Sequence, residues 1–495
     1  MKRIFFWALL IVSGMFGDDF NQLGSEIIEY LWRFHPVDAT YKGIHKYDTL
    51  LTDFRPEVLR ARFKDIKIFE QRLDRIDTLS LSVDEYIDYA LLRIMLKNEI
   101  FTGESLMIYR KNPLIYVNEA IYGIYNILIR SSPSVQLKME AIRARLTKIP
   151  DLFDQARKNL VEPPPILCKI AIEQLREGAV FFNDLAARYT DSLGPEANKE
   201  FITAKEKAVV AMVAFRYWLE DIEKGPATSY ALGHSKYAYK LREIHLLDMS
   251  IDSILSLGQN MLNLTSRVID SLKKAYQSKE TPLLKPPADF KPDDVKRYRQ
   301  WEIEEMRRFV GSQGVDYVTV PDYVGAMFVV ETPKFLRGLI PGIAMEPPGP
   351  FDKSTTSYFY VRPLPERFDS SEAVRYYNYI RQRGFKGSVV HEGFPGHHLQ
   401  LSIANQHPSP IRRSISDNFL IEGWALYCEE LMARSGLYED TIGAIIGYLG
   451  GVRFRSARVI VDVMLQTGQY DYEQAVNFMC QTFGGGQADS VFFAR

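Results

Sequence analysis

Hydrophobic residues recur at helical spacing along most of the first half of the chain. In the segment from residue 56 to 76, successive apolar residues are three or four positions apart, which places them on one face of a helix. They are Leu59, Phe63, Ile66 and Phe69. Similar spacing extends from Phe20 to about Ala156 and returns at 251–276. The pattern predicts a series of amphipathic helices, and a solvated helical bundle of this kind needs no chemistry of its own.

The pattern changes after Gly314. Three short runs of β-branched and aromatic residues follow, separated by Pro and Gly, at 316–323, 326–332 and 356–363. Runs of this kind are typical of strands, so we expect a small antiparallel β element near 315–363. Helical spacing resumes at residue 370 and continues almost to the end of the chain.

These elements predict a mainly α fold with one small sheet. Prolines within 162–166 and 283–294 interrupt the helices, because proline lacks a backbone N–H and cannot continue a helix. We expect an N-terminal helical region at 18–300. A second, catalytic region is expected at 301–495, which holds the sheet and a histidine-rich segment.

The first residues have the layout of a secretory signal peptide. Lys2 and Arg3 precede an apolar run from Ile4 to Gly17, and aspartates follow. The run is shorter than the ~20 apolar residues that cross a membrane, so we expect a signal peptide at 1–17 that is removed on export. The mature protein would then lie in the periplasm or outside the cell, without stable membrane insertion. An uncleaved anchor and a buried first helix are the alternatives.

The composition narrows the classes of partner and of metal site. The 495-residue chain has a formal net charge of -1 and therefore no global basic field, which argues against nucleic acid as a partner. The three cysteines, Cys168, Cys428 and Cys480, are far apart in the sequence. They form neither a disulfide framework nor the close pairs of a structural zinc module, so any metal must use His and carboxylate ligands.

Candidate ligands gather in the segment "HEGFPGHHLQ" (391–400), which contains three of the eight histidines of the chain. In the zinc-peptidase signature H-E-x-x-H, two histidines four residues apart share one face of a helix. Here His397 and His398 follow His391 by six and seven residues, and neither spacing fits a regular helix well. Surface histidines at a helix end are the alternative interpretation.

A local distortion would bring the histidines together. Pro395 cannot donate to the carbonyl of His391, and Gly396 favours helix formation only weakly, so a bulge is expected here. A bulge that absorbs two residues makes His397 the partner of His391. One that absorbs three residues selects His398, and the residues alone leave both open.

A third ligand is expected from the segment 418–431. Glu422 lies there in the apolar run "FLIEGWALY", where an unpaired charge would be costly to bury. Glu429 lies two turns later on the same helical face. An ordinary ion pair therefore accounts for either glutamate taken alone.

The segments "HEGFPGHHLQ" and "EGWALYCEEL" resemble the hallmark segments of the bacterial domain-of-unknown-function 885 family, which is grouped with the gluzincin-like metallopeptidases. The resemblance implies a large helical zincin-like fold with a catalytic cleft that holds zinc. Carried over to this sequence, it implies that His391, His397 and Glu422 bind the zinc. It also implies that Glu392 is catalytic, and it leaves His398 as an alternative ligand.

The resemblance begins at residues 31–53 and covers most of the chain, with two departures. The segment 456–475 resembles a family stretch that usually has a histidine where this chain has Gln466, so one candidate donor to the transition state is altered. The last residues, 484–495, resemble the family's P-G-Q-A segment, after which relatives continue through further helices. We therefore expect a short form or a truncated chain.

The chemistry implied is metal-assisted hydrolysis of a peptide or amide substrate. Bound Zn²⁺ makes water a nucleophile at neutral pH, and Glu392 would take its proton as general base. Tyr358 or Tyr360 in the predicted strand would stabilise the developing charge. Arg455 or Arg458 would hold a substrate carboxylate. Tyr360 and Arg458 are the preferred candidates, although packing and surface ion pairs account for such residues equally well.

The preferred function is therefore that of an exported zinc metallopeptidase. Two other functions fit the same residues: a non-catalytic helical binding protein with a degenerate metal cleft, and a zinc amidase that acts on a non-peptide amide. The adjacent residues His391 and Glu392 favour an enzyme, because a purely structural metal needs no neighbouring base. Gln466 favours the binding protein.

Overall fold

The structure is a computed structural model. It describes residues 19–132, 134–189, 194–224, 229–275, 289–312, 318–337, 342–361, 371, 373–374, 377, 386–438 and 441–484. The predicted signal peptide at 1–17 and the end of the chain at 485–495 lie outside these residues, as does most of the helix expected from residue 370. Within the described residues, no helix combines the length and apolar character that a membrane span requires.

The chain is divided between two compact units. Unit 1 comprises Met1–Thr228 and two short later segments, Pro350–Asp352 and His407–Ser416. Unit 2 comprises Ser229–Gly349, Lys353–Gln406 and Asp417–Arg495. The boundary expected after residue 300 lies inside unit 2, within a helix.

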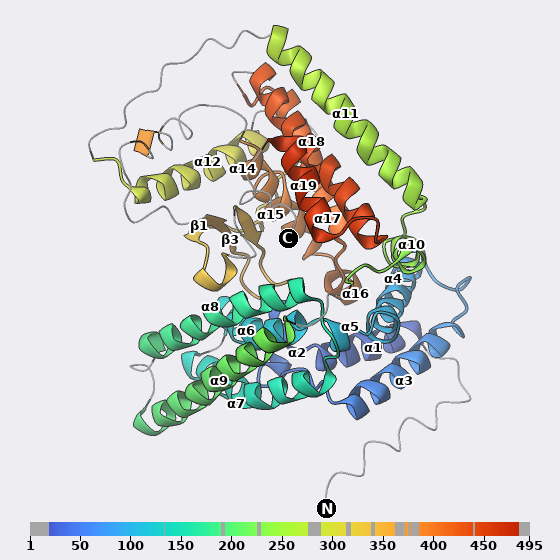
Figure 1. Ribbon diagram of the computed structural model, residues 1–495, viewed down its shortest axis with the longest axis vertical. Coiled ribbons are helices and arrows are strands. Elements are labelled where there is room, and N and C mark those ends of the chain that lie inside the picture. The colour runs from blue at the N-terminus through green and yellow to red at the C-terminus, as the bar shows by residue number, and fades with distance from the viewer. Residues whose placement is uncertain are drawn as a thin grey trace, which may run out of the picture. The chain divides into compact units, whose positions relative to one another are not determined.

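Unit 1 is built from helices (Figure 1). The amphipathic helix expected at 56–76 is present, and its four predicted apolar residues are buried on one face. The helices of unit 1 are α1 (Phe20–Phe34), α2 (Pro36–Tyr41), η1 (His45–Tyr47), α3 (Pro56–Leu73), α4 (Val83–Ile100), η2 (Phe101–Ser105), α5 (Ile108–Lys111), α6 (Leu114–Ile129), α7 (Val135–Asn159), α8 (Pro165–Tyr189), α9 (Pro195–Ile222) and α16 (Pro410–Ser414).

Unit 2 combines helices with a three-stranded sheet (Figure 1). The mainly α class predicted from the sequence is confirmed. The elements of unit 2 are α10 (His234–Tyr239), η4 (Lys240–Ile244), α11 (Ile251–Ala275), α12 (Pro292–Ser312), β1 (Met327–Glu331), η5 (Lys334–Leu336), β2 (Ala344–Glu346), β3 (Ser357–Val361), α14 (Gly387–Glu392), α15 (His397–Ala404), α17 (Asn418–Arg434), α18 (Thr441–Gln466) and α19 (Tyr472–Phe483).

The sheet is mixed, so the prediction of an antiparallel element was wrong in part. Strand β3 is central: it pairs parallel with β1 and antiparallel with β2. The long connection between β1 and β3 permits the parallel crossover. Residues 318–323 form no strand, and Pro321 lacks the N–H that a ladder needs. Strand β2 was not predicted, because three residues are too few to show an alternating pattern.

The core of unit 2 joins the sheet to the helices that carry the histidines. Apolar side chains from β1, β3, α14, α17 and the segment between α14 and α15 pack together without exposure to solvent. This packing places the N-terminal end of α15 between the sheet and α17. Members of the cluster include Met327, Phe359, Val389, Val390, Phe394 and Met432.

A buried arginine organises unit 1. Arg145 of α7 is fully buried, and its guanidinium donates to the carbonyls of Leu50 at 2.8 Å and Pro36 at 3.1 Å. It also donates to the hydroxyl of Thr40 at 2.7 Å and to the carbonyl of Gly123 in α6. Burial lowers the pKa of Arg145 to about 10, so the side chain remains charged at neutral pH.

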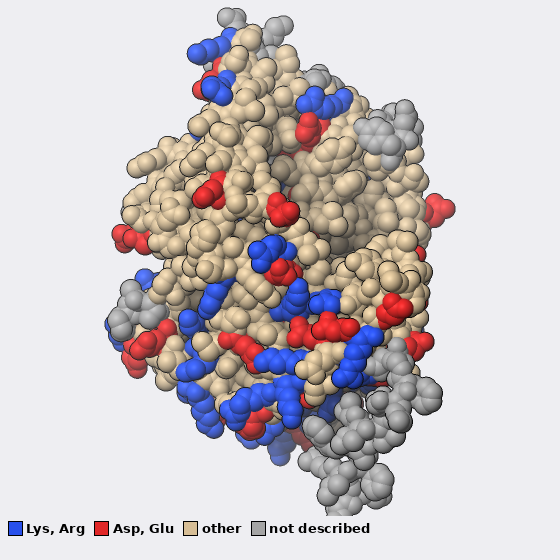
Figure 2. All heavy atoms as spheres, turned by 90° about the vertical axis from the view of Figure 1, so that its right-hand side faces the viewer, with Lys and Arg blue, Asp and Glu red and all other residues tan. Residues whose placement is uncertain are grey.

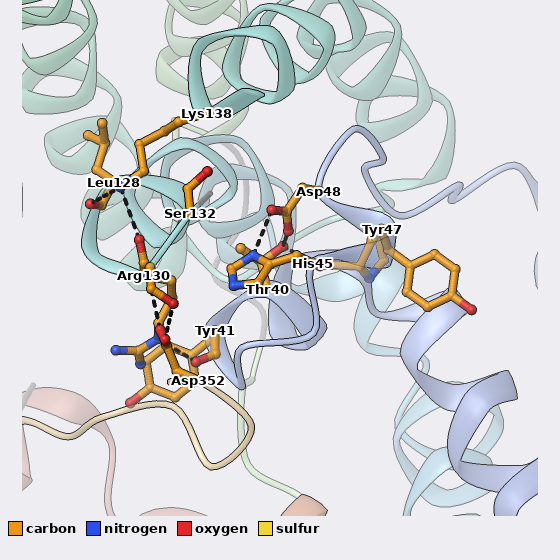
Figure 3. A network of polar contacts seen from close by, with 12 residues as sticks. Thr40, Tyr41, His45, Tyr47, Asp48, Leu128, Arg130, Ser132, Lys138 and Asp352 are labelled. Atoms are coloured by element: carbon orange, nitrogen blue, oxygen red, sulfur yellow. Dashed lines mark hydrogen bonds and ion pairs between the residues drawn. The ribbon is translucent and has the colours of Figure 1, made fainter. Parts of the chain in front are cut away.

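The segment that Arg145 binds includes much of the stretch in which the family resemblance begins. Asp48 accepts a hydrogen bond from Thr40 at 2.7 Å and lies 2.8 Å from Nδ1 of His45, and Figure 3 shows these side chains turned toward one another. The hydrogen bond to Asp48 raises the pKa of His45. Residues 36–50, which carry part of the family resemblance, therefore fold around the side chain of Arg145.

Charged residues on the surface of unit 1 are mixed in sign. Figure 2 shows Lys and Arg side chains gathered with Asp and Glu among them. Two examples are the pairs Lys67–Glu104 and Arg93–Asp74, each with 2.7 Å between nitrogen and oxygen. Exposed pairs of this kind contribute at most about 1 kcal/mol each, so buried contacts decide the stability of unit 1.

We expect the substitution Arg145→Met to lower the free energy of unfolding of unit 1 by at least about 3 kcal/mol, because it leaves several buried acceptors without a donor. Thermal denaturation followed by circular dichroism measures the change. Arg143→Met is the matched control, since Arg143 lies on the same helix in a partly exposed pair with Glu200. Equal losses in the two variants would contradict the organising role of Arg145.

Candidate functional site

The segment 391–400 forms two helices joined by a break, and not one helix with a bulge. Helix α14 ends at Glu392, and α15 begins at His397. Across the break, the N–H of Gly396 bonds to the carbonyl of Val390 at 3.1 Å, six residues earlier instead of the helical four. Two residues are thus absorbed. His397 takes the place that a residue four positions after His391 has in a regular helix.

The break is held from α17. Trp424 donates its indole N–H to the carbonyl of Pro395 at 2.9 Å, and Sγ of Cys428 lies 3.5 Å from the same oxygen. The bond between Phe394 and Pro395 is cis. The tryptophan of the sequence segment "EGWALY" therefore fixes the helix that bears Glu422 to the histidine segment.

Only glycine fits at position 396. A Cβ on Gly396 would lie 2.0 Å from the carbonyl oxygen of His391 and 2.3 Å from that of Val390. Both distances are far inside van der Waals contact, so a side chain here would push the two helix ends apart. The glycine permits the close approach that brings His397 toward His391.

His391, His397 and Glu422 meet at the break. Each offers one ligand atom, and these atoms lie within 4.8 Å of one another. The carboxylate of Glu422 lies 3.3 Å from Nε2 of His391 and 3.7 Å from Nε2 of His397. Both imidazoles are buried, whereas the side chain of Glu422 is 61% exposed. The cluster is therefore reached from the side of Glu422, which is not buried as the apolar run around it had suggested.

Glu429 and Arg455 orient His391 through its Nδ1 atom, whereas Nε2 faces Glu422. Nδ1 of His391 lies 2.9 Å from the carboxylate of Glu429, which is buried, and Arg455 donates to that carboxylate at 3.0 Å. A histidine that donates its Nδ1–H to a carboxylate presents Nε2 in a fixed direction. Here that direction is toward Glu422. The ion pair considered for Glu429 from the sequence is thus present, with Arg455 as its partner.

Burial and neighbouring charges set the protonation of the cluster. Burial lowers the pKa of His391, but hydrogen bonds to Glu422 and Glu429 help to outweigh it and raise that pKa to about 9. The pKa of His397 falls to about 4, because burial and the charge of His391 both oppose its protonation. A neutral histidine carries a lone pair that can bind a cation.

Glu392 has a different environment from the three clustered residues. Burial raises the pKa of Glu392 to about 7, against the opposing charge of His391 and a backbone hydrogen bond from Met345. Met345 lies in β2, at the edge of the sheet. The side chain of Glu392 is thus held in place by an edge strand of the sheet.

His398 does not join the cluster. Its Nδ1 lies 2.7 Å from the hydroxyl of Ser357 in β3, and its Nε2 lies 3.1 Å from the carbonyl of Gly325. Both ring nitrogens are therefore used in holding α15, one to β3 and the other to the segment that precedes β1. Of the two histidines left open by the sequence, the structure brings His397 to His391 and gives His398 a packing role.

The other predicted residues are placed as follows. Tyr360 is buried in β3, where it pairs with Val330 of β1 and Ala344 of β2. Arg458 is exposed, with its guanidinium 6.0 Å from the ring centroid of Phe454. Arg455, and not Arg458, is the arginine that contacts the carboxylate of Glu429 behind His391. The catalytic roles of Tyr360 and Arg458 stay predictions.

Tyr358, the other tyrosine considered in the strand, is partly exposed in β3 and pairs there with Phe328 of β1 and Glu346 of β2. It was considered as a donor on the strength of its strand alone. Its role is also a prediction.

Gln466 lies far along α18 from the cluster. It ends that helix, eleven residues after Arg455, which corresponds to about 16 Å along the axis. Its backbone carbonyl accepts a hydrogen bond from Gly233, and its side-chain oxygen is buried without a hydrogen-bond partner among the described residues. A residue at this position is poorly placed to donate to a group beside His391.

Sequence reasoning missed two functions at the site. Glu429 was considered only as a partner in an ordinary ion pair, although its spacing of seven residues from Glu422 was a usable signal. The sequence predicts no role for Trp424, because a hydrogen bond to the carbonyl of Pro395 has no signature in the spacing of residues.

Comparisons with known proteins agree on the fold. The profile of the family described as "Bacterial protein of unknown function (DUF885)" matches residues 36–491. None of the curated proteins matches the chain. A proposed lipoprotein of unknown function from Shewanella oneidensis has a TM-score of 0.72 at 23% identity, and a proposed lipoprotein from Colwellia psychrerythraea has a TM-score of 0.72 at 18% identity. Each comparison covers 96% of this chain and 88% of the solved chain.

We expect Gly396→Ala to destabilise unit 2 by about 1–3 kcal/mol or more, because the added methyl group overpacks the break. Thermal denaturation measures the change. Gly423→Ala in α17 is the matched control, because no described residue has an atom within 4 Å of a Cβ at that position. Alanine is also favoured over glycine in a helix by roughly 0.5–1 kcal/mol. If both variants were as stable as the parent, the close approach at Gly396 would be refuted.

Proposed function

Because the chain belongs to the bacterial DUF885 family, whose function is unknown, its activity must be inferred from the site, and we propose that it is an exported zinc-dependent hydrolase that cleaves peptide bonds. The observation that carries the proposal is the convergence of His391, His397 and Glu422, with His391 oriented by a buried carboxylate. The gluzincin-like relationship is part of this proposal.

The residues fit a catalytic zinc ion. Two imidazole nitrogens and one carboxylate oxygen are the donor types that zinc prefers, and three protein ligands leave a position for water or substrate. The carboxylate of Glu429 behind His391 is the usual outer partner of a zinc-bound histidine. The exposed side of Glu422 provides access for a substrate.

When bound, zinc supplies an activated water and polarises the carbonyl that the water attacks. Glu392 accepts the proton of the attacking water as general base and passes it to the leaving amine. The backbone N–H of Met345 holds Glu392 in place for this task. Arg455 holds Glu429, and Glu429 holds the ring of His391, so these two residues position a ligand and do not contact the reacting atoms.

Hydrolysis is favoured over metal-dependent binding by the position of Glu392. A binding protein needs ligands only, whereas here an additional carboxylic acid follows the first ligand and is held by the sheet. Gln466, which had favoured a binding protein, lies about 16 Å along α18 from Arg455. Its departure from the family pattern therefore bears little on the proposed chemistry.

Export is part of the proposal. The two solved relatives are described as proposed lipoproteins, and the first residues of this chain have the layout of a signal peptide. A peptidase in the periplasm or outside the cell would meet extracellular peptides as substrates. Zinc is likewise proposed as the resident metal, because two histidines and one glutamate form a donor set of catalytic zinc sites.

We expect His397→Ala to lose tight zinc binding and His398→Asn to retain it, because only His397 reaches the cluster. Elemental analysis of the purified full chain after dialysis measures zinc per chain, with the parent protein as reference. The asparagine keeps a polar contact with Ser357 and limits damage to the fold. Retention of zinc by His397→Ala together with its loss from His398→Asn would reverse the assignment.

We expect Glu392→Gln to keep zinc and fold while hydrolysis falls by about 10²- to 10⁴-fold, the usual contribution of a general base. Zinc content and the hydrolysis of a peptide mixture are measured on the same preparation. Glu346→Gln, in the adjacent strand β2, is a control for loss of a nearby carboxylate. A variant Glu392→Gln with parental turnover refutes the general base, and one that loses zinc makes Glu392 a ligand.

A further inference from the structure

Two exposed aromatic residues and a glycine between them lie in a row along α17, beside Glu422. Phe419, Gly423 and Tyr427 follow one another at intervals of four, so they share one face of the helix. The side chains of Phe419 and Tyr427 are exposed, at 51% and 50%. Among the residues that the structure describes, no atom lies within 4 Å of a Cβ built on Gly423. Two aromatic side chains thus border an empty position, with about 12 Å along the axis between their Cα atoms. We call this feature the α17 slot.

The Phe419 side of the α17 slot is supported from outside. The ring of His245 packs on the ring of Phe419 with 4.7 Å between centroids. Nδ1 of His245 lies 2.8 Å from the carboxylate of Asp417, which also accepts the backbone N–H of Phe419 at 2.8 Å and caps α17. One acid therefore fixes both the start of the helix and the residue that supports Phe419.

The Tyr427 side is supported in the same way. The ring of Trp424 lies against that of Tyr427, with 6.0 Å between centroids. Trp424 is itself fixed by its hydrogen bond to the carbonyl of Pro395. Both aromatic borders of the slot are therefore held by residues that have hydrogen bonds elsewhere, and Trp424 links the slot to the break that carries His397.

The α17 slot adjoins the candidate metal site and is apolar. Glu422 directly precedes Gly423 and lies one turn after Phe419, so its Cβ is about 5–6 Å from that of Phe419. It is the one charged residue between Asn418 and Cys428. Leu420, which is 66% exposed, extends the apolar surface.

We propose that the α17 slot binds an aromatic or large aliphatic side chain of the peptide substrate, next to the bond that is cleaved. The inference rests on the proposed function. Exposed aromatic rings at a fixed separation gain apolar burial and ring contacts when a third apolar group enters between them. An opening that is one residue wide, with glycine at its base, fits a side chain better than the broad surface of a second protein.

The test compares Gly423→Leu with Gly450→Leu in the full chain. Gly450 is the matched control, because it also lies in a helix and the described part of the chain has no atom within 4 Å of its Cβ position. Leucine at 423 extends into the slot from a Cβ position that the described residues leave open. Two peptides that differ only in Phe or Ser beside the cleaved bond serve as substrates. We expect the parent and Gly450→Leu to favour the Phe peptide in kcat/KM by roughly 10- to 200-fold, and Gly423→Leu to lose that preference.

Binding provides a second readout that does not need turnover. Saturation-transfer NMR with N-acetyl-phenylalanine amide, and with N-acetyl-serine amide as reference, should show contact with the parent and with Gly450→Leu but not with Gly423→Leu. If the parent cleaves no peptide but these binding results hold, the slot stands and the proposed hydrolase fails. If Gly423→Leu keeps the Phe preference and the contact, the slot is refuted.

The oligomeric state separates the slot from a subunit interface. Light scattering on the parent and on Gly423→Leu should give the same molar mass. A lower mass for Gly423→Leu alone would show that this face of α17 joins two copies of the chain, and would overturn the assignment to substrate.

Discussion

The carbonyl oxygen of Pro395 is the point on which the candidate site depends. It accepts a hydrogen bond from Trp424 and lies in contact with Cys428, so the helix that bears Glu422 is tied to the break between the two histidines. Regular helical hydrogen bonds reach both ends of the break, from Gly393 to the carbonyl of Val389 and from Gln400 to that of Gly396, whereas Gly396 itself bonds six residues back. The attachment to α17 therefore helps to fix the shape of the break. His397 reaches His391 only through that shape.

The charges around the break are balanced by direct contacts between neighbouring side chains. His391 lies between two carboxylates, those of Glu422 and Glu429, and Arg455 compensates the inner one. The outer carboxylate, that of Glu422, is exposed. It therefore avoids the cost of burying a charge. Because Glu422 is exposed, a substrate can reach the cluster and the apolar surface next to it on α17.

Unit 1 shows that residues recognisable in a sequence need not belong to a site. The stretch 36–50 carries part of the family resemblance, and its polar side chains are used to fold a segment around Arg145. These contacts lie within unit 1, and the candidate ligands lie within unit 2. A polar residue that is easy to recognise can therefore be buried to hold the fold together, as His398 is beside Ser357.

The sequence by itself determined the helical class, the bounds of α3 and α11 to within a few residues, and the candidate ligands His391 and Glu422 with either His397 or His398. Helical spacing is a local property of the chain, and the spacing of apolar residues therefore predicts it. The count of two absorbed residues was one of two open alternatives, because Pro395 and Gly396 indicate a distortion without fixing its size.

Only the tertiary structure decided between those alternatives. The bond from Trp424 to Pro395 and the contacts of His398 with Ser357 and Gly325 join segments far apart in the sequence. The close approach of Gly396 to the carbonyls of Val390 and His391 follows from the shape of the break. The mixed sheet has the same cause, since parallel pairing of β1 with β3 depends on the path of their connection. Contacts of this kind depend on how elements pack in space, and no periodic pattern of residues records them.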